Sequence, residues 1–116
     1  MTVRERIAEA ANTDVPREAC GFVLDDGEVV HCTNVSYTPW FRFKVDPAEA
    51  AEWWLTGRVV GVWHSHPTGP AVPSEEDEED TEPGIDHLIY SVEDEDLAVY
   101  LVEDGRFGLV RMESPE

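Results

Sequence analysis

Two histidines, His64 and His66, stand two residues apart in the segment His64-Ser65-His66-Pro67. Because side chains alternate between the two faces of an extended segment, both imidazoles are expected on the same side, where one metal ion can bind them. Asp77 follows eleven residues after His66 and could supply a third ligand. A water would then hold the fourth position, which is the arrangement of a catalytic rather than a structural zinc site. The spacing therefore predicts a hydrolytic metal centre.

The other candidate residues have simpler alternatives. Asp77 lies in the acidic run 75–80, and such a run is usually the solvated face of a helix. Ser74 and Asp77 also have the spacing of a helix-capping box, although glutamate or glutamine is preferred at the second position. Both interpretations stay open from the residues alone. His31 and His87 have no partner at ligand spacing, so structural roles are expected for both.

An apolar run over residues 59–63 predicts a buried strand that delivers His64 at its carboxyl end. A loop rich in proline and glycine follows, and α/β folds place ligand sites in such loops. Trp63 is expected to point away from His64, into the core. Ser65 is likewise expected to face away from the metal and to have at most a supporting hydrogen-bond role.

The remaining elements follow from hydrophobic periodicity and from turn residues. Asp46 is expected to cap a helix that starts at Pro47 and stops at Gly57, with either Trp53 or Trp54 partly exposed. Asn12 to Pro16 is expected to break the first helix. Further helices are predicted over residues 3–11 and 74–80, and further strands over 19–24, 28–34, 40–45, 87–91, 97–103 and 106–112. These elements predict an α/β fold with a mixed β-sheet flanked by helices.

The chain has 116 residues, which fits a single domain over residues 1–116 with a frayed tail at 113–116. Its formal net charge of −18 argues against nucleic-acid and anionic-lipid partners. A high-salt cytoplasm, a basic partner or simple solubility would each fit this charge. We expect no membrane span and no secretory signal, and hence a cytoplasmic protein.

Two cysteines, Cys20 and Cys32, flank the predicted turn at Asp25-Asp26-Gly27. A three-residue loop would set them opposite each other on paired strands, whereas a two-residue loop would put them on opposite faces. Free buried thiols are expected, with a disulfide as the alternative, because nothing marks the chain as secreted.

The motif H-S-H-P, followed by S-x-x-D from Ser74 to Asp77, resembles that of the JAMM (MPN-plus) metalloproteases. The segment Pro16-Arg17-Glu18-Ala19-Cys20-Gly21-Phe22 resembles the P-x-E-x-C-G segment of that family. Residues 43–47, with Phe43 and Asp46-Pro47, resemble its F-x-x-D-P entry to the second helix. The resemblance covers roughly residues 1–112 and implies a JAMM/cytidine-deaminase-like fold.

The resemblance also implies a mechanism. His64, His66 and Asp77 would bind Zn²⁺, and Glu18 would be the general base that takes a proton from the water and hands it to the departing amine. Ser74 would donate a hydrogen bond to the oxyanion. Taken without the resemblance, Glu18 would be read as a surface residue before a strand.

The resemblance leaves the substrate open. One branch of the family removes ubiquitin-like modifiers from lysine side chains, another trims a sulfur-carrier protein, and a third belongs to phage tail tips, which would place the protein in a virion tail. In its compactness the chain most resembles the phage-tail branch. We expect a protein or peptide substrate, either a ubiquitin-like modifier or a cell-wall peptide, and possible partners among tail proteins. A structural tail-assembly protein with a stabilising metal site, or an acidic binding module, are the alternatives of another class.

Overall fold

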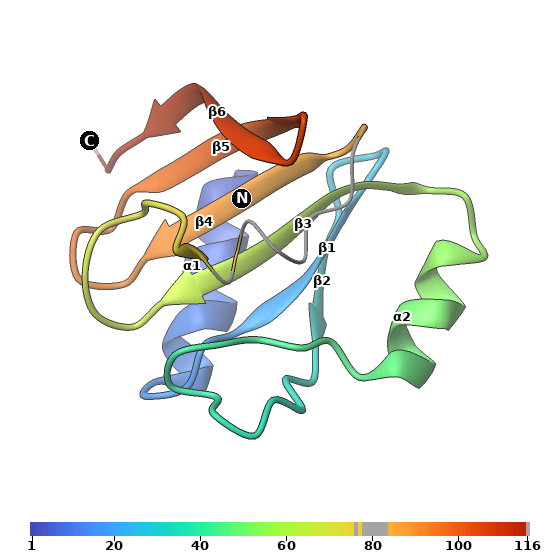
Figure 1. The fold of residues 1–116 in the computed structure, drawn as a ribbon, viewed down its shortest axis with the longest axis horizontal. Helices are drawn as coiled ribbons and strands as arrows, with labels where there is room; N and C mark the ends of the chain where they lie inside the picture. The colour runs from blue at the N-terminus through green and yellow to red at the C-terminus, as the bar shows by residue number, and fades with distance from the viewer. Residues whose placement is uncertain (76, 78–83, 116) are drawn as a thin grey trace.

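The computed structural model describes residues 1–75, 77 and 84–115. Its centre is a six-stranded mixed sheet in the order β2-β1-β3-β4-β5-β6, in which β3 and β4 run parallel and every other neighbouring pair is antiparallel (Figure 1). The described elements are α1 (Val3–Asp14), β1 (Cys20–Leu24), β2 (Val29–Cys32), α2 (Pro47–Trp54), β3 (Val59–His66), β4 (Asp86–Ser91), β5 (Leu97–Glu103) and β6 (Arg106–Glu113). The predicted α/β fold with a mixed sheet is confirmed.

Helix α1 covers one face of this sheet. Thr2 caps its start by accepting a hydrogen bond from the backbone N–H of Glu5, whose carboxylate bonds back to the Thr2 N–H. The helix buries Ile7 and Ala11 against Trp63 and other apolar side chains of the strands. Trp63 therefore points into the core, as predicted.

Helix α2 lies near the β2 edge of the sheet and packs on its opposite face (Figure 1). Asp46 caps it through the Ala48 N–H, with Pro47 in the first turn, as predicted. Trp53 packs against the cluster around Phe22, whereas Trp54 is 39% exposed. None of the described helices is long and apolar enough to cross a membrane.

Three of the expected element boundaries are wrong. Helix α1 continues through residues 12–14 to Asp14, because no proline interrupts it before Pro16 and Thr13 bonds back to the Glu9 carbonyl. Strand β3 runs to His66 rather than stopping before His64, since parallel pairing with β4 extends to His66. At the other end of the chain, Glu113 lies in β6 rather than in a frayed tail.

The expected strand over residues 40–45 is also wrong. This segment is irregular and makes a single bridge, from Val45 to Asn34. The reason is that the backbone at Arg42 and Lys44 hydrogen-bonds to the Asn34 side chain instead of to a neighbouring strand. Most of the expected helix over residues 74–80 lies outside the described residues.

Strands β1 and β2 set Cys20 directly opposite Cys32, which is the register expected for a three-residue loop. Both thiols are free and buried. Burial raises the pKa of the Cys32 thiol to about 12 and raises that of Cys20 still further. Both cysteines are therefore inert thiols at neutral pH.

Candidate metal centre

Three side chains converge at the carboxyl end of β3. The Nε2 atoms of His64 and His66 are 3.2 Å apart. Asp77 places one carboxylate oxygen 3.2 Å from His64 Nε2 and the other 3.3 Å from His66 Nε2. In a tetrahedral zinc site with bonds of about 2.0–2.1 Å, the donor atoms are about 3.3 Å apart. The spacing of this trio thus fits a zinc ion, and its chemistry, two imidazoles and a carboxylate, is a zinc donor set.

The His66 ring is fixed by a hydrogen bond on its far side. Its Nδ1 donates to the Pro70 carbonyl oxygen at 2.9 Å, because a carbonyl can only accept. In the neutral ring, this bond leaves Nε2 as the nitrogen with a lone pair toward the other two side chains, the arrangement of a metal-binding histidine. Burial would lower the pKa of His66, but the bonds to Asp77 and Pro70 and the nearby Glu18 carboxylate together raise it.

His64 is almost fully buried, and it stacks on the ring of Phe43 with centroids 4.4 Å apart and an interplanar angle of 17°. Burial lowers the pKa of His64 because a charged imidazole loses its hydration there. The neutral form that a metal requires is therefore favoured. Phe43 holds the plane of this ring in place.

Asp77 is 8% exposed and is held by reciprocal bonds with Ser74. The Ser74 N–H donates to Asp77 Oδ2 at 2.9 Å, and the Asp77 N–H donates to Ser74 Oγ at 3.2 Å. Burial alone would raise the pKa of Asp77, but the hydrogen bonds from both histidines and from the Ser74 backbone hold it well below its ordinary value. The capping pair considered from sequence is thus present, and it orients the carboxylate toward the histidines.

Glu18 is 4% exposed and precedes β1 by two residues. Cys20 pairs with His64 in the sheet, so alternation along the chain puts Glu18 on the face that carries His64 and His66. Its carboxylate is close enough to act electrostatically on His66. The interpretation of Glu18 as a surface residue is therefore wrong.

Ser65 lies between the two histidines and is fully buried. Its hydroxyl oxygen accepts a 2.8 Å hydrogen bond from the Ala19 N–H, and its own N–H donates to the Ala19 carbonyl. Ser65 thus ties the residue after Glu18 to the strand that carries the histidines, which is the supporting role expected for it.

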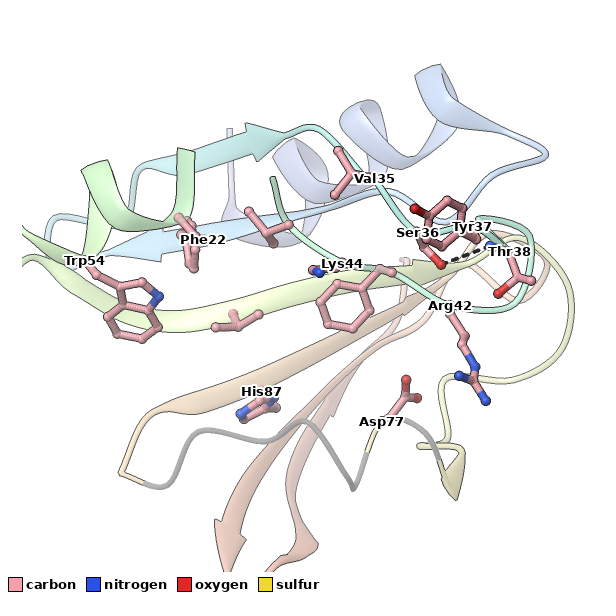
Figure 2. A pocket seen from close by; sticks show the side chains of 14 residues that line it. Phe22, Val35, Ser36, Tyr37, Thr38, Arg42, Lys44, Trp54, Asp77 and His87 are labelled. Atoms are coloured by element: carbon pink, nitrogen blue, oxygen red, sulfur yellow. Dashed lines mark hydrogen bonds between the residues drawn. The ribbon is translucent and has the colours of Figure 1, made fainter. Parts of the chain in front are cut away.

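A cavity of about 890 Å³ opens beside the trio. Figure 2 shows Asp77 and His87 facing the segment that carries Val35 and Arg42, across this space. The sequence does not predict the cavity, because residues 40–45, which form part of one wall, have the pattern of a strand. Most of its lining is apolar and includes Phe22, Phe43, Val45, Ala50, Trp54 and Val62.

The two remaining histidines do not join the trio. His31 Nε2 lies 2.8 Å from Asp14 Oδ2, which links β2 to the end of α1. His87 is buried on β4 and packs against the Phe107 ring at 5.1 Å. The structural role expected for His31 agrees with its contact, whereas His87 also lines the cavity.

Comparison with known proteins adds three similarities. A model of prokaryotic homologs of the JAB domain matches residues 2–103. Tail tip assembly protein K of Escherichia phage N15 is 40% identical over 81 residues, which make up 66% of this chain and 32% of that protein. Desampylase of Haloferax volcanii is 33% identical over 95 residues, or 72% of this chain and 68% of that protein. The chain therefore spans about a third of the tail protein and about two thirds of the desampylase, and it belongs to the family of prokaryotic homologs of the JAB domain.

Proposed function

We propose that this protein is a zinc-dependent hydrolase of amide bonds. The observation that carries the proposal is the convergence of His64, His66 and Asp77: the two Nε2 atoms are 3.2 Å apart, and each lies 3.2–3.3 Å from one of the two carboxylate oxygens of Asp77. These residues would hold the ion, and Glu18 lies on the face of the sheet that carries both histidines. A stabilising metal site would need a fourth protein ligand instead.

The chemistry that a bound zinc supplies is a hydroxide nucleophile at neutral pH, because coordination lowers the pKa of water to about 7. The Glu18 carboxylate would accept the proton of that water and later deliver it to the departing amine. Its buried position on the face of the histidines suits this role.

The Ser74 hydroxyl would orient the substrate. Its oxygen already accepts a bond from the Asp77 N–H, so its own hydrogen is directed elsewhere. A hydrogen bond from this group to the substrate carbonyl oxygen would strengthen as negative charge develops there, which is how an oxyanion donor lowers the barrier.

For the substrate, we favour an isopeptide bond between a small protein modifier and a lysine side chain. The match to desampylase supports this choice, because it covers about two thirds of both chains. The cavity beside the trio, about 890 Å³ and mainly apolar, is large enough for several residues of an extended peptide. A peptidase of a phage tail tip is the second candidate, favoured by the 40% identity to tail tip assembly protein K.

The experiment is a cleavage assay of the zinc-loaded protein with two substrates, a ubiquitin-like modifier joined to a lysine side chain and a cell-wall stem peptide. Cleavage of the first alone supports the favoured substrate, and cleavage of the second alone supports the tail peptidase. His66→Ala serves as the metal-free control and should cleave neither. A wild-type protein that binds one zinc and cleaves no amide would contradict the proposal and support a structural role.

A further inference from the structure

The Asn34 side chain lies between the Glu18 segment and the wall of the cavity. Asn34 follows β2, is 6% exposed and begins the irregular stretch at 35–45, termed the wall segment below. We propose that Asn34 is a positioning residue, which holds Glu18 and the wall segment together as one unit. This inference rests on the proposed function, in which Glu18 is the general base.

The amide nitrogen of Asn34 bonds to the Glu18 backbone on one side and to the wall segment on the other. Nδ2 donates to the Glu18 carbonyl oxygen at 2.9 Å and to the Arg42 carbonyl oxygen at 3.1 Å. Both amide hydrogens are therefore used, one on each side of the connection. The assignment of oxygen and nitrogen in this amide is settled by its partners, because the two carbonyls accept and cannot donate.

The amide oxygen of Asn34 bonds to two backbone N–H groups of the wall segment. Oδ1 accepts from the Ser36 N–H and from the Lys44 N–H, each at 3.0 Å. These two residues stand near the beginning and the end of the wall segment, so one oxygen closes the loop. All four hydrogen-bonding positions of the Asn34 side chain are filled, which is the maximum for an amide of this kind.

The wall segment also reaches Glu18 directly. The Glu18 N–H donates to the Pro39 carbonyl oxygen at 2.6 Å. The backbone of Glu18 is thus held on both sides, through its N–H by Pro39 and through its carbonyl by Asn34.

The same segment forms the surface that a substrate would touch. Val35 and Tyr37 line the cavity, and Phe43 both lines it and stacks on His64. A peptide bound in the cavity would therefore press on the backbone that holds Glu18. If Asn34 lost its two amide hydrogens, the bonds from the Ser36 and Lys44 N–H groups to a side-chain oxygen would still hold the wall segment together. The bond that holds the Glu18 carbonyl would be lost, so Glu18 would be less firmly positioned.

Asn34→Asp separates these two effects. A carboxylate keeps acceptors for Ser36 and Lys44 but has no hydrogens for the Glu18 and Arg42 carbonyls. We expect kcat to fall about 10- to 100-fold, as for other residues that orient a catalytic group, with a much smaller change in KM and an unchanged zinc content. Asn12→Asp, which makes the same change at an exposed site on α1, is the matched control and should behave like the wild type.

Tyr37→Ala should show the opposite pattern. Tyr37 is fully exposed on the wall segment, so its removal takes away substrate contact without touching the Asn34 bonds. KM should rise more than kcat falls. An Asn34→Asp enzyme with wild-type kcat, alongside an inactive Glu18→Gln enzyme, would overturn the proposal.

A second measurement is independent of activity. In the wild type, the amide hydrogens of Ser36 and Lys44 should exchange slowly with solvent although neither residue lies in a helix or strand. They should exchange quickly in Asn34→Ala and remain slow in Asn34→Asp. Fast exchange in the wild type would refute the role of Asn34 even if no substrate is cleaved, and slow exchange without cleavage would instead count against the proposed function.

Discussion

Replacing Gly21 with alanine should destabilise the protein severely. Gly21 lies in β1 between His31 of β2 and Trp63 of β3. The Trp63 indole crosses over it and donates from Nε1 to the Val30 carbonyl oxygen at 3.1 Å. A Cβ at Gly21 would overlap that oxygen and would lie 2.8 Å from the indole nitrogen. Because one of the obstructing atoms is backbone, a simple side-chain rotation cannot relieve the clash.

The cost can be estimated from two effects. Separating the indole from the carbonyl leaves buried polar groups without a partner, at about 1–3 kcal/mol each. The displaced ring and strands add an overpacking cost of about 1–3 kcal/mol. With two such polar groups, the indole N–H and the carbonyl, the sum is about 3–9 kcal/mol, a large fraction of the about 5–15 kcal/mol by which a domain is usually stable. Since β1 and β3 carry the residues around the metal centre, zinc binding should weaken as well.

Urea denaturation followed by circular dichroism measures this loss in the metal-free protein. Gly108→Ala is the matched control, because Gly108 also lies in a strand and an added Cβ there would meet only the Leu101 carbonyl oxygen at 3.9 Å. That variant should differ from the wild type by less than about 1 kcal/mol. A Gly21→Ala protein as stable as the Gly108→Ala protein would refute the packing described for Trp63.

Three further predictions concern the metal centre. Ser65→Ala should cost about 1–3 kcal/mol in urea unfolding, because the buried Ala19 N–H loses its acceptor; a loss below about 0.5 kcal/mol would show that this bond contributes little. Zinc affinity, measured by competition with a chelator, should fall as the pH drops through the raised pKa of His66, since the imidazole must lose its proton to bind the ion. If the affinity did not change between about pH 8 and about pH 5, the range in which histidine ordinarily titrates, this prediction would be contradicted. In the metal-free protein, the depressed pKa of Asp77 implies a stabilisation that is present above its ordinary value of 3.8 and is lost as the pH falls below it. The difference in free energy of unfolding between the wild type and Asp77→Asn should therefore shrink in acid. A difference that grows as the pH falls would contradict the depressed pKa of Asp77.

Much of the fold could be predicted from local patterns. Strand β5 has the predicted bounds, and the cap at Asp46 and Pro47 begins α2 as expected. The same-side placement of His64 and His66 follows from strand alternation alone. Asp77 could be singled out from its acidic neighbours only through the family motif, because a run of carboxylates has no internal signal that marks one of them. Its role as a ligand stays a prediction.

The parts that could not be predicted depend on contacts between residues far apart in the chain. Residues 40–45 have the composition of a strand, but the Asn34 amide takes the hydrogen bonds that a neighbouring strand would have provided. The cavity exists because this segment is held away from the sheet in that way. Likewise, the Glu18 backbone is held by Pro39 and Asn34, and that of the next residue, Ala19, by Ser65; none of these partners stands near Glu18 in sequence.

In the proposed mechanism, Glu18 acts as a base beside a zinc ion held by His64, His66 and Asp77. The most direct test compares the wild type with Glu18→Gln at equal zinc content, measured by elemental analysis, on the substrate that the wild type cleaves. Glutamine has nearly the same shape and cannot accept the proton, so the variant should bind one zinc ion as the wild type does and lose hydrolysis. A zinc-loaded Glu18→Gln protein that cleaves at the wild-type rate would contradict the account.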